Sequence, residues 1–590
     1  MKFEEIIPHL GEFGKYQKTQ LFLLSLPVWV TGMHALAMTF IAASQDFRCF
    51  IPGWDDYSNK TGPLNYSLIF PTDEDGQYDR CNMYAVNVTR GVWYTIPDNT
   101  TATVQCNQWV YDTSQYKTSV FSQFNMVCDR KYLNNLAQSM YMAGMLVGAI
   151  VIGDLSDRFG RKRLMFISQV FQVLCGVALA FAPEYITFTT LRFLLGAAHS
   201  GVFLPGFVIA MELIGAKQGR AITGISFNAF FAVGFCTLSL AAYFVQYWFW
   251  LQLIITAPSV FFLIYCWDRI IPGSARWFMQ NSQVERSKKI IQKAAKMNGM
   301  PDIQKLIDQL EPDSHEKSHV FKIMKYPRMR NRALIMFFNW FTTSLVFYGL
   351  SLGTSQLPGG NDYLNLSLSG LVEFPGFLFC ILVMDRIGRR PCLCISMISC
   401  GVACIGAAVI PDTAGLDWLS ITLSMIGKAF SGACFVLVYN YSAEAFPTVV
   451  RNGVIGVCSM IARVGGILAP LVNLTGSYTS KEIPPIVFGV TSLVAGLLAL
   501  LLPETLGTHM PETLEHGEAF GTPKYNETLY ASASKTDKND IQYDRSKEQN
   551  TSQSSKVGAI NESFNNDDYG SEDESHSPRS GKLQTTHSWK

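Results

Sequence analysis

The sequence predicts an all-α membrane protein with twelve transmembrane helices in two parallel repeats of six and a large extracellular loop after the first helix. Of its 590 residues, 48% are hydrophobic and 16% are charged, and the apolar residues come in long runs. Roughly twenty apolar residues in a helix span the hydrocarbon core of a bilayer. A charged turn after the second run, GDLSDRFGRKR at 153–163, recurs in shortened form as DRIGRR at 385–390. This recurrence indicates an internal duplication.

The apolar runs give twelve predicted spans, and an even number places both termini on one side of the membrane. The first run is longer than the core of a signal peptide, so we expect it to remain as a span. Residues 268–332 hold fourteen Lys or Arg and the turn at 154–163 adds four, which predicts that both segments are cytoplasmic. The spans are predicted at 21–43, 134–153, 164–182, 186–210, 219–245, 250–267, 332–353, 364–384, 392–410, 416–440, 453–473 and 484–502.

The long polar segment between the first two spans is predicted to face the outside of the cell. It contains four cysteines, enough for two disulfides in any of three connectivities. It also contains four N-glycosylation sequons, which are acceptors only in the secretory lumen. The alternative is free thiols in a cytosolic loop with chance sequons. The cysteines are Cys49, Cys81, Cys106 and Cys128, and the sequons begin at Asn59, Asn65, Asn87 and Asn99.

The spans and loops define five predicted segments. The stretch Val284 to Met297 has apolar residues at helical spacing, so we expect an amphipathic helix lying on the inner leaflet, or a solvated linker helix. The residues after 502 are rich in Ser, Asn, Asp and Lys and cannot bury a core. The segments are a cytoplasmic N-terminus at 1–20, a six-helix half at 21–267 with the extracellular loop 44–133, a cytoplasmic linker at 268–331, a six-helix half at 332–502 and a disordered cytoplasmic tail at 503–590.

Further features repeat between the two halves. Pro272-Gly273-Ser274 follows the sixth span and Pro503-Glu504-Thr505 follows the twelfth, while Glu212 and Glu444 end the fourth and tenth spans. Two parallel repeats of six helices that rock about a central site are an arrangement used by secondary transporters. The sequence therefore favours a transporter.

The charged turns carry a resemblance to a known family. GDLSDRFGRKR agrees at every defined position with the signature G-x-L-x-D-R-x-G-R-[RK]-[RK] of the major facilitator superfamily. Within it, the chain resembles the organic cation and carnitine transporters through LGEFGKYQ at 10–17, the cysteine-bearing outer loop, YSAEAFPTVVRN at 441–452 and LLPETLG at 501–507. The resemblance covers about residues 1–510. It departs at 272–277, where PGSARW replaces the family's P-E-S-P-R-W and one acid is lost.

The resemblance implies a secondary-active or facilitative transporter of the plasma membrane that works by alternating access. Its cargo would be small organic cations and zwitterions such as carnitine, with sodium or a proton as the coupling ion. An organic anion exchanger of the same family is the first alternative, and a receptor or sensor built on a transporter fold is the second. The sequence contains no phosphate loop, no G-x-S-x-G and no H-E-x-x-H, so we expect no enzyme, cofactor or metal site. The net charge of +1 predicts no nucleic-acid partner; the lipid bilayer is the expected surrounding.

The two turns are predicted to form a latch that holds the inner face closed. The alternative is that their basic residues only enforce topology, although topology does not require the Gly and Asp positions. Asp157→Asn is expected to weaken the outward-open state. The predicted gating residues are Gly153, Asp157, Arg158, Gly160, Arg161, Glu212 and Arg276 in the first half and Asp385, Arg386, Gly388, Arg389, Glu444, Arg451 and Glu504 in the second.

Three ionisable residues stand near the middle of predicted spans, where insertion costs at least about 2.5–3.5 kcal/mol. They are Glu373, Lys428 and Arg463. They either line the substrate path or neutralise one another in a buried cluster. By resemblance, the Glu373 position belongs to the cation-accepting surface, and the Arg463 position carries a cation in carnitine and anion transporters. A Glu with aromatic faces suits a quaternary ammonium and an Arg suits a carboxylate.

Aromatic residues are predicted to complete the binding site. The resemblance assigns Phe203, Asn228, Phe231 and Phe347 to the pocket, and Tyr348 lies beside them in the sequence. The alternative for each aromatic residue is contact with lipid or with a neighbouring helix. His34 and His199 could relay protons, or make hydrogen bonds between helices.

Overall fold

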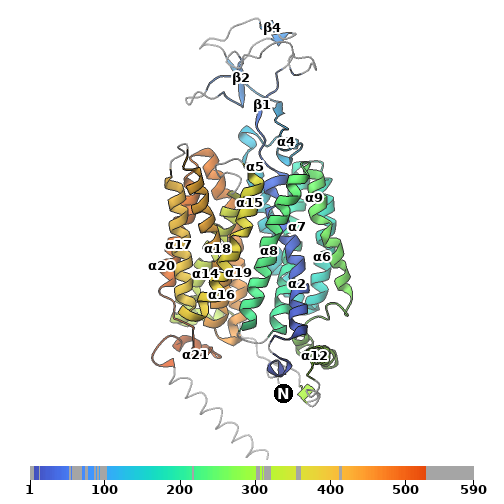
Figure 1. Ribbon diagram of the computed structural model, residues 1–590, viewed down its shortest axis with the longest axis vertical. Coiled ribbons are helices and arrows are strands. Elements are labelled where there is room, and N and C mark those ends of the chain that lie inside the picture. The colour runs from blue at the N-terminus through green and yellow to red at the C-terminus, as the bar shows by residue number, and fades with distance from the viewer. Residues whose placement is uncertain are drawn as a thin grey trace, which may run out of the picture. The chain divides into compact units, whose positions relative to one another are not determined.

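A computed structural model of the chain, shown in Figure 1, forms two units, 1–521 and 522–590. The fold and the candidate site lie in the first unit. The structure describes residues 6–11, 13–51, 55, 69–72, 78–84, 88–89, 92–93, 102–214, 218–300, 306–307, 310, 320–353, 361–410 and 415–525.

The first six predicted spans are helical, each joined to the next in the predicted order. The first consists of α2 and the short α3, and the sixth is α9 followed by α10 and the 3-10 helix η4, with a break ahead of Pro258. The bounds are α2 Lys15–Leu36, α3 Met38–Ile41, α5 Tyr132–Phe159, α6 Arg161–Ala180, α7 Tyr185–Leu213, α8 Gln218–Phe244, α9 Trp248–Thr256, α10 Pro258–Phe261 and η4 Phe262–Cys266.

The second six spans follow the same plan. Within the described residues, eleven helices are long and apolar enough to cross a membrane, and α20, a shorter apolar helix, coincides with the twelfth predicted run. The prediction of twelve spans is confirmed. The bounds are α14 Pro327–Leu352, α15 Asp362–Leu371, α16 Glu373–Ile387, α17 Arg389–Val409, α18 Asp417–Ala445, α19 Thr448–Tyr478 and α20 Ile483–Ala499.

The eighth span is interrupted between α15 and α16, and the sequence explains the break. Pro375 has no N–H to donate, and its ring clashes with the carbonyl of the residue four positions earlier. The helix is therefore interrupted at Val372, and Glu373 becomes the first residue of α16. A proline two residues downstream thus fixes where an intramembrane carboxylate stands.

The two halves have largely distinct hydrophobic cores and meet mainly along the pairs α5–α19 and α8–α15. One core is built mainly from α2 and α5 to α9, the other from α14 and α16 to α20 (Figure 1). Between the halves, Ser139 on α5 donates to the carbonyl of Ile467 on α19 at 2.9 Å. The thiol of Cys236 on α8 contacts the carbonyl of Ser367 on α15 at 3.6 Å. We call the end of the helices that carries the two charged turns the inner end, and the opposite end the outer end.

The segment between the first two spans contains short strands, so the chain is not purely α-helical as predicted. Two disulfides, Cys49–Cys106 and Cys81–Cys128, select one of the three connectivities that the sequence left open. The four predicted glycosylation sites lie outside the described residues. The antiparallel pairs are β1 Phe47–Cys49 with β6 Trp109–Tyr111, β2 Asn82–Tyr84 with β5 Thr103–Gln105, and β3 Val88–Thr89 with β4 Val92–Trp93; α4 Val120–Gln123 and the 3-10 helix η3 Cys128–Arg130 follow.

The linker contains the predicted amphipathic helix as α12, Val284–Asn298, but its apolar face is covered by protein. Ile290, Ile291 and Ala294 are buried against the short helix α11, Ala275–Gln280, and the N-terminal residues around the 3-10 helix η1, Pro8–Leu10. Asn298 accepts a hydrogen bond from the backbone N–H of Tyr16 at 2.9 Å, at the start of α2. Protein therefore covers most of this face, which neither expectation included, while Met297 at its end remains exposed.

The predicted disordered tail begins too early at 503, because residues 503–521 are ordered against the second half. The short helix α21, Leu514–Ala519, places the Glu518 carboxylate at the first turn of α14, where it accepts from the N–H groups of Arg328 (3.1 Å) and Met329 (3.0 Å). Buried Arg332 donates to the carbonyls of Gly517 (3.1 Å) and Phe520 (3.0 Å). We call residues 511–521 the C-terminal strap. It caps the first helix of the second half as Asn298 caps that of the first. The 3-10 helix η6, Val320–Lys325, precedes α14 in the chain.

Candidate functional site

Glu373 and Lys428 form a buried ion pair inside the second half. The Lys428 Nζ lies 3.0 Å from the Glu373 Oε1, and each residue is 1% exposed. Moving two charges out of water is costly unless they are paired and their remaining hydrogen-bonding groups are satisfied. Of the two alternatives from the sequence, mutual neutralisation holds for this pair.

An aromatic ring and a hydroxyl complete the surroundings of the Lys428 ammonium. The nitrogen lies 3.2 Å from the ring centre of Phe347 and donates to the Ser351 hydroxyl at 2.6 Å. Phe235, on α8 of the opposite half, presents its ring at 5.5 Å. A carboxylate and two aromatic faces around an ammonium are the groups that bind an organic cation. Lys428 thus occupies a cation site formed by both halves.

Arg463 does not join this pair. Its guanidinium donates to the carbonyl (2.8 Å) and the hydroxyl (2.5 Å) of Ser459 one turn earlier on α19. Its Nε is buried without a hydrogen-bond partner, and no carboxylate within the described ranges forms an ion pair with it. The predicted cluster of three is therefore a pair and a separate, uncompensated cation.

Phe231, Phe347 and Tyr348 of the predicted pocket form one connected group, and Phe203 joins it through the ring of His199. Phe231 and Phe347 bridge the two halves with ring centres 6.4 Å apart, and Tyr348 contacts Phe347 at 5.4 Å. Phe203 packs edge-on against Phe227 at 5.6 Å. The Asn228 amide donates to the Gly224 carbonyl of its own helix.

The two histidines lie in the first half. His199 shares a 2.7 Å hydrogen bond with Tyr141, as one of the two expectations for it allows. Both ring nitrogens of His34 are buried without a hydrogen-bond partner in the described part of the chain. The ring of Phe230, which follows Asn228 closely in the sequence, contacts Phe22 instead of the central group.

A cavity of about 590 Å³ lies between the outer ends of the two halves, lined by α3, α5, α15 and α19 among others. Asp362 is the only acidic residue in its described wall, and its carboxylate accepts a 2.8 Å hydrogen bond from Tyr116. Burial and the Asp362 charge raise the pKa of the Tyr116 hydroxyl, so it remains the donor. The polar lining includes Lys131, Asn134, Gln138, Asp362, Asn473 and Lys481.

Arg192 is a buried charge that the sequence reasoning missed. It is 0% exposed and contacts Gln138 and the backbone of His34. It lies seven residues into α7, roughly 10 Å below the start of that helix at about 1.5 Å per residue. The sequence prediction concerned charges near the middle of a span, and Arg192 lies near the end of its predicted span. A single Arg within an otherwise uncharged run is the signal that would have identified it.

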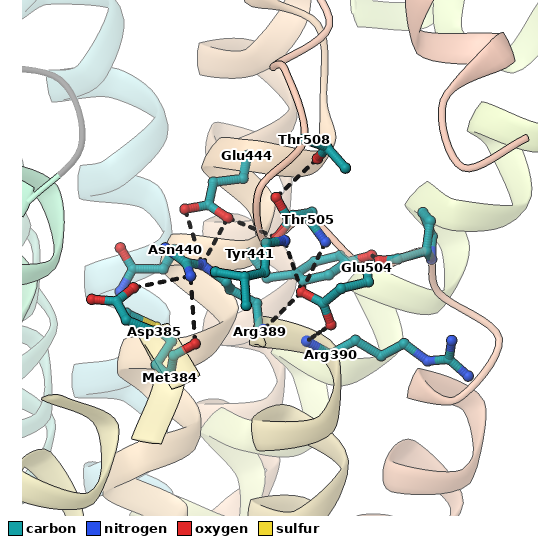
Figure 2. A network of polar contacts seen from close by, with 12 residues as sticks. Met384, Asp385, Arg389, Arg390, Asn440, Tyr441, Glu444, Glu504, Thr505 and Thr508 are labelled. Atoms are coloured by element: carbon teal, nitrogen blue, oxygen red, sulfur yellow. Dashed lines mark hydrogen bonds and ion pairs between the residues drawn. The ribbon is translucent and has the colours of Figure 1, made fainter. Parts of the chain in front are cut away.

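Figure 2 shows the charged turn at the inner end of the second half, where one arginine is held by two acids. Arg389 lies 3.0 Å from Asp385 and 3.0 Å from Glu444. Glu504 accepts from the backbone N–H groups of Arg389 (2.9 Å) and Arg390 (3.1 Å), at the first turn of α17. The turn itself requires glycine, because Gly388 has φ +102°.

The first half has a similar arrangement without a counterpart of Glu504. Arg161 is paired with Glu212 and lies 3.4 Å from Asp157, and Gly160 has φ +103°. The Trp277 indole donates to the Asp157 carbonyl at 2.7 Å. Gly273 stands where the second half has Glu504, and no side chain among the described residues caps the backbone N–H groups at the start of α6. The Asp268 carboxylate instead pairs with the Lys162 ammonium of that turn at 2.5 Å.

The remaining predicted gate residues are peripheral to these pairs. Arg158 pairs with Asp154 at 3.0 Å, and Arg451 donates to the Phe446 carbonyl at 3.2 Å. Arg386 is exposed and forms no ion pair with any described residue. Gly153 is the first residue of the charged turn and lies on α5, and Arg276 is the second residue of α11.

Comparisons with known proteins agree with this architecture. The chain matches the Major Facilitator Superfamily over residues 131–470 and 333–524. It is 41% identical over 534 residues to "Organic cation transporter protein" of Drosophila melanogaster, covering 88% of this chain and 95% of that protein. It is 33% identical over 541 residues to "Solute carrier family 22 member 2" of Rattus norvegicus, covering 88% and 96%.

A solved structure supports the fold alone. The partially occluded inward-open form of the xylose transporter XylE from E. coli superposes with a TM-score of 0.55 at 13% identity, covering 85% of this chain and 100% of XylE.

Two six-helix halves with a buried ion pair and matching charged turns at the inner end define a membrane transporter. The chain belongs to the major facilitator superfamily. The resemblance to the organic cation transporters, read from the sequence motifs, is confirmed by these relatives.

Proposed function

We propose that this chain is a plasma-membrane transporter that carries small organic cations, and zwitterions such as carnitine, by alternating access. The single observation that carries the proposal is the occupied cation site. Lys428 places an ammonium 3.0 Å from the Glu373 carboxylate and 3.2 Å from the Phe347 ring centre. The names of the relatives, which are organic cation transporters, support the same cargo.

Lys428 acts in this proposal as an internal substitute for the solute. An arriving cation takes its place beside Glu373 and Phe347, and the Lys428 ammonium retains the hydroxyl of Ser351 and the 3.5 Å contact with the Phe347 carbonyl. A pair that is always satisfied keeps Glu373 from being buried as an unpaired charge between transport cycles. Because Phe235 comes from the other half, exchange at this site is linked to the rocking of the halves.

The inner gates supply the conformational control. Each joins the cytoplasmic ends of its helices through an Arg–Glu pair, Arg161–Glu212 in the first half and Arg389–Glu444 in the second. The proposed orientation has both termini and both gates in the cytoplasm. Sodium or a proton is the proposed coupling ion.

An organic anion exchanger is the second candidate. It is favoured by one observation, that Arg192 and Arg463 have no carboxylate partner among the described residues while Glu373 is already neutralised. A competition panel decides between the two. Uptake of labelled tetraethylammonium that carnitine inhibits and a dicarboxylate does not would support the proposal, and the reverse pattern would support anion exchange. Repeating the panel without sodium tests the coupling ion.

A further inference from the structure

Arg192 carries a positive charge deep within the first half, and none of its contacts neutralises it. Its guanidinium donates to the side-chain oxygen of Gln138 at 2.8 Å and to the backbone carbonyl of His34 at 3.3 Å. The guanidinium carbon lies 4.6 Å from the ring centre of Tyr141, and the Nε is buried without a partner. No carboxylate within the described ranges forms an ion pair with it. Buried arginines are ordinarily paired with an acid, so this charge requires an explanation.

Gln138 connects this charge to the cavity between the outer ends of the halves. Gln138 is one of the residues that line the cavity, and its side-chain oxygen accepts the hydrogen bond from Arg192. The positive charge therefore stands one hydrogen bond behind the cavity wall. In a low-dielectric surrounding the field of such a charge is weakly screened and extends into the cavity.

The other charged groups of the cavity wall make its net charge positive. Lys131 and Lys481 lie at the wall as exposed side chains. Asp362 is the only acid there among the described residues, and the Tyr116 hydroxyl is bonded to it. With Arg192, three positive charges face one negative charge. Such a cavity attracts a carboxylate and disfavours a solute that is only cationic.

We propose that Arg192 makes the outer cavity select solutes that carry a carboxylate, so that zwitterions are favoured over simple cations. Arg192 is a positioning residue in this proposal, since it acts through Gln138 and the cavity field without touching the solute. The proposal rests on the proposed transport function and adds a specificity step ahead of the Glu373 site. The carboxylate is attracted in the outer cavity, and the cationic group is then bound at Glu373.

The alternative is that Arg192 only ties α2, α5 and α7 together. Two variants distinguish these roles. Arg192→Gln removes the charge, whereas Gln138→Glu keeps the arginine and places a neutralising carboxylate against it. If the charge of Arg192 sets the selectivity, both variants lose the preference for a carboxylate. If Arg192 only holds the helices together, Gln138→Glu leaves that preference unchanged. Arg332→Gln is the matched control, because Arg332 is also a buried arginine that donates to backbone carbonyls, but at the inner end.

The experiment compares two probes that differ only in the carboxylate, carnitine and carnitine methyl ester. Their uptake by the full-length chain in cells is normalised to surface protein. Arg192→Gln and Gln138→Glu are expected to raise the KM for carnitine about tenfold, the effect of about 1.4 kcal/mol, with less than a twofold change for the ester. Arg192→Lys is expected to retain most of the preference. Arg332→Gln is expected to change surface amount without changing the carnitine-to-ester ratio.

The proposal would be overturned if Arg192→Gln reduced the uptake of both probes equally and Gln138→Glu left the ratio of their uptake unchanged. Arg192 would then have only a structural role in holding the helices together. If Arg192→Gln does not reach the surface, the ratio of carnitine uptake to ester uptake in Gln138→Glu decides between the two roles of Arg192. A wild-type chain that takes up the ester as well as carnitine contradicts the specificity step only. A wild-type chain that takes up neither contradicts the proposed transport function.

Discussion

Ser274 donates a 2.5 Å hydrogen bond to Glu212, and in the second half Thr505 has the same relation to Glu444 at 2.7 Å. A hydroxyl just after the last helix of each half thus holds the acid that pairs with the gate arginine. The residue before each hydroxyl differs, since Gly273 replaces the acid found at Glu504. The two charged turns therefore share a plan, and in the second the Glu504 carboxylate also accepts from the backbone N–H groups at the start of α17 (Figure 2).

The first prediction is that the gate of the first half is more sensitive to loss of its acid. Glu212→Gln removes the closest partner of Arg161, and no described carboxylate accepts from the backbone N–H groups at the start of α6. After Glu444→Gln, Glu504 still binds the first turn of α17. Glu212→Gln is expected to increase labelling of a cytoplasmic single-cysteine reporter at least twice as much as Glu444→Gln.

Asp157→Asn is the graded control for this comparison. The Asp157 side chain is 55% exposed and lies 3.4 Å from Arg161. We therefore expect Asp157→Asn to weaken the outward-open state less than Glu212→Gln does. Equal labelling in all three variants would show that these pairs do not hold the inner face closed.

The second prediction concerns the central ion pair. Glu373→Gln leaves the Lys428 ammonium buried without its counter-charge, and loss of one partner of a buried pair costs about 3–5 kcal/mol. We expect a lower melting temperature in detergent and loss of tetraethylammonium uptake. Glu373→Gln combined with Lys428→Met should recover thermal stability without recovering uptake. Recovered uptake in the double variant would mean that Glu373 serves folding only.

The third prediction concerns the C-terminal strap. Glu518→Ala leaves the first turn of α14 uncapped, which costs about 0.5–2 kcal/mol by analogy with other helix caps. A chain ending at 510 lacks the strap and should be retained inside the cell or melt early. A chain ending at 525 keeps every described contact of the strap and should reach the surface normally. Equal surface amounts for the two truncations would refute a structural role.

The fourth prediction is the disulfide connectivity. Proteolysis without reduction should yield peptides that join Cys49 to Cys106 and Cys81 to Cys128. Single replacement of Cys81 by Ser should leave Cys128 reactive toward a membrane-impermeant maleimide, with Cys49 protected. Peptides joining Cys49 to Cys81 would contradict the structure.

Most of the fold could be predicted from the sequence because its signals are strong. Apolar runs of span length located the helices, and a repeated charged turn revealed the duplication. The short strands of the outer loop were missed because segments of two or three residues have no measurable periodicity. The helix at 284–298 was found by its spacing, but its partner was not, since an apolar face looks the same whether protein or lipid covers it.

The candidate site was only partly predictable. Intramembrane charge identified Glu373, Lys428 and Arg463, but only three-dimensional packing shows that the first two pair while Arg463 turns back to Ser459. Arg192 lay too near the predicted end of its span to be considered. The exchange of acid for glycine at Gly273 was visible in the sequence. Its consequence, that no described side chain caps the start of α6, required the structure.

The proposed transport cycle is tested most directly by countertransport in liposomes that contain the purified chain. Vesicles loaded with unlabelled tetraethylammonium should take up external labelled tetraethylammonium faster than empty vesicles, and Glu373→Gln should abolish this difference. Saturable binding of the label without such acceleration would contradict alternating access. It would instead identify the chain as a receptor built on a transporter fold.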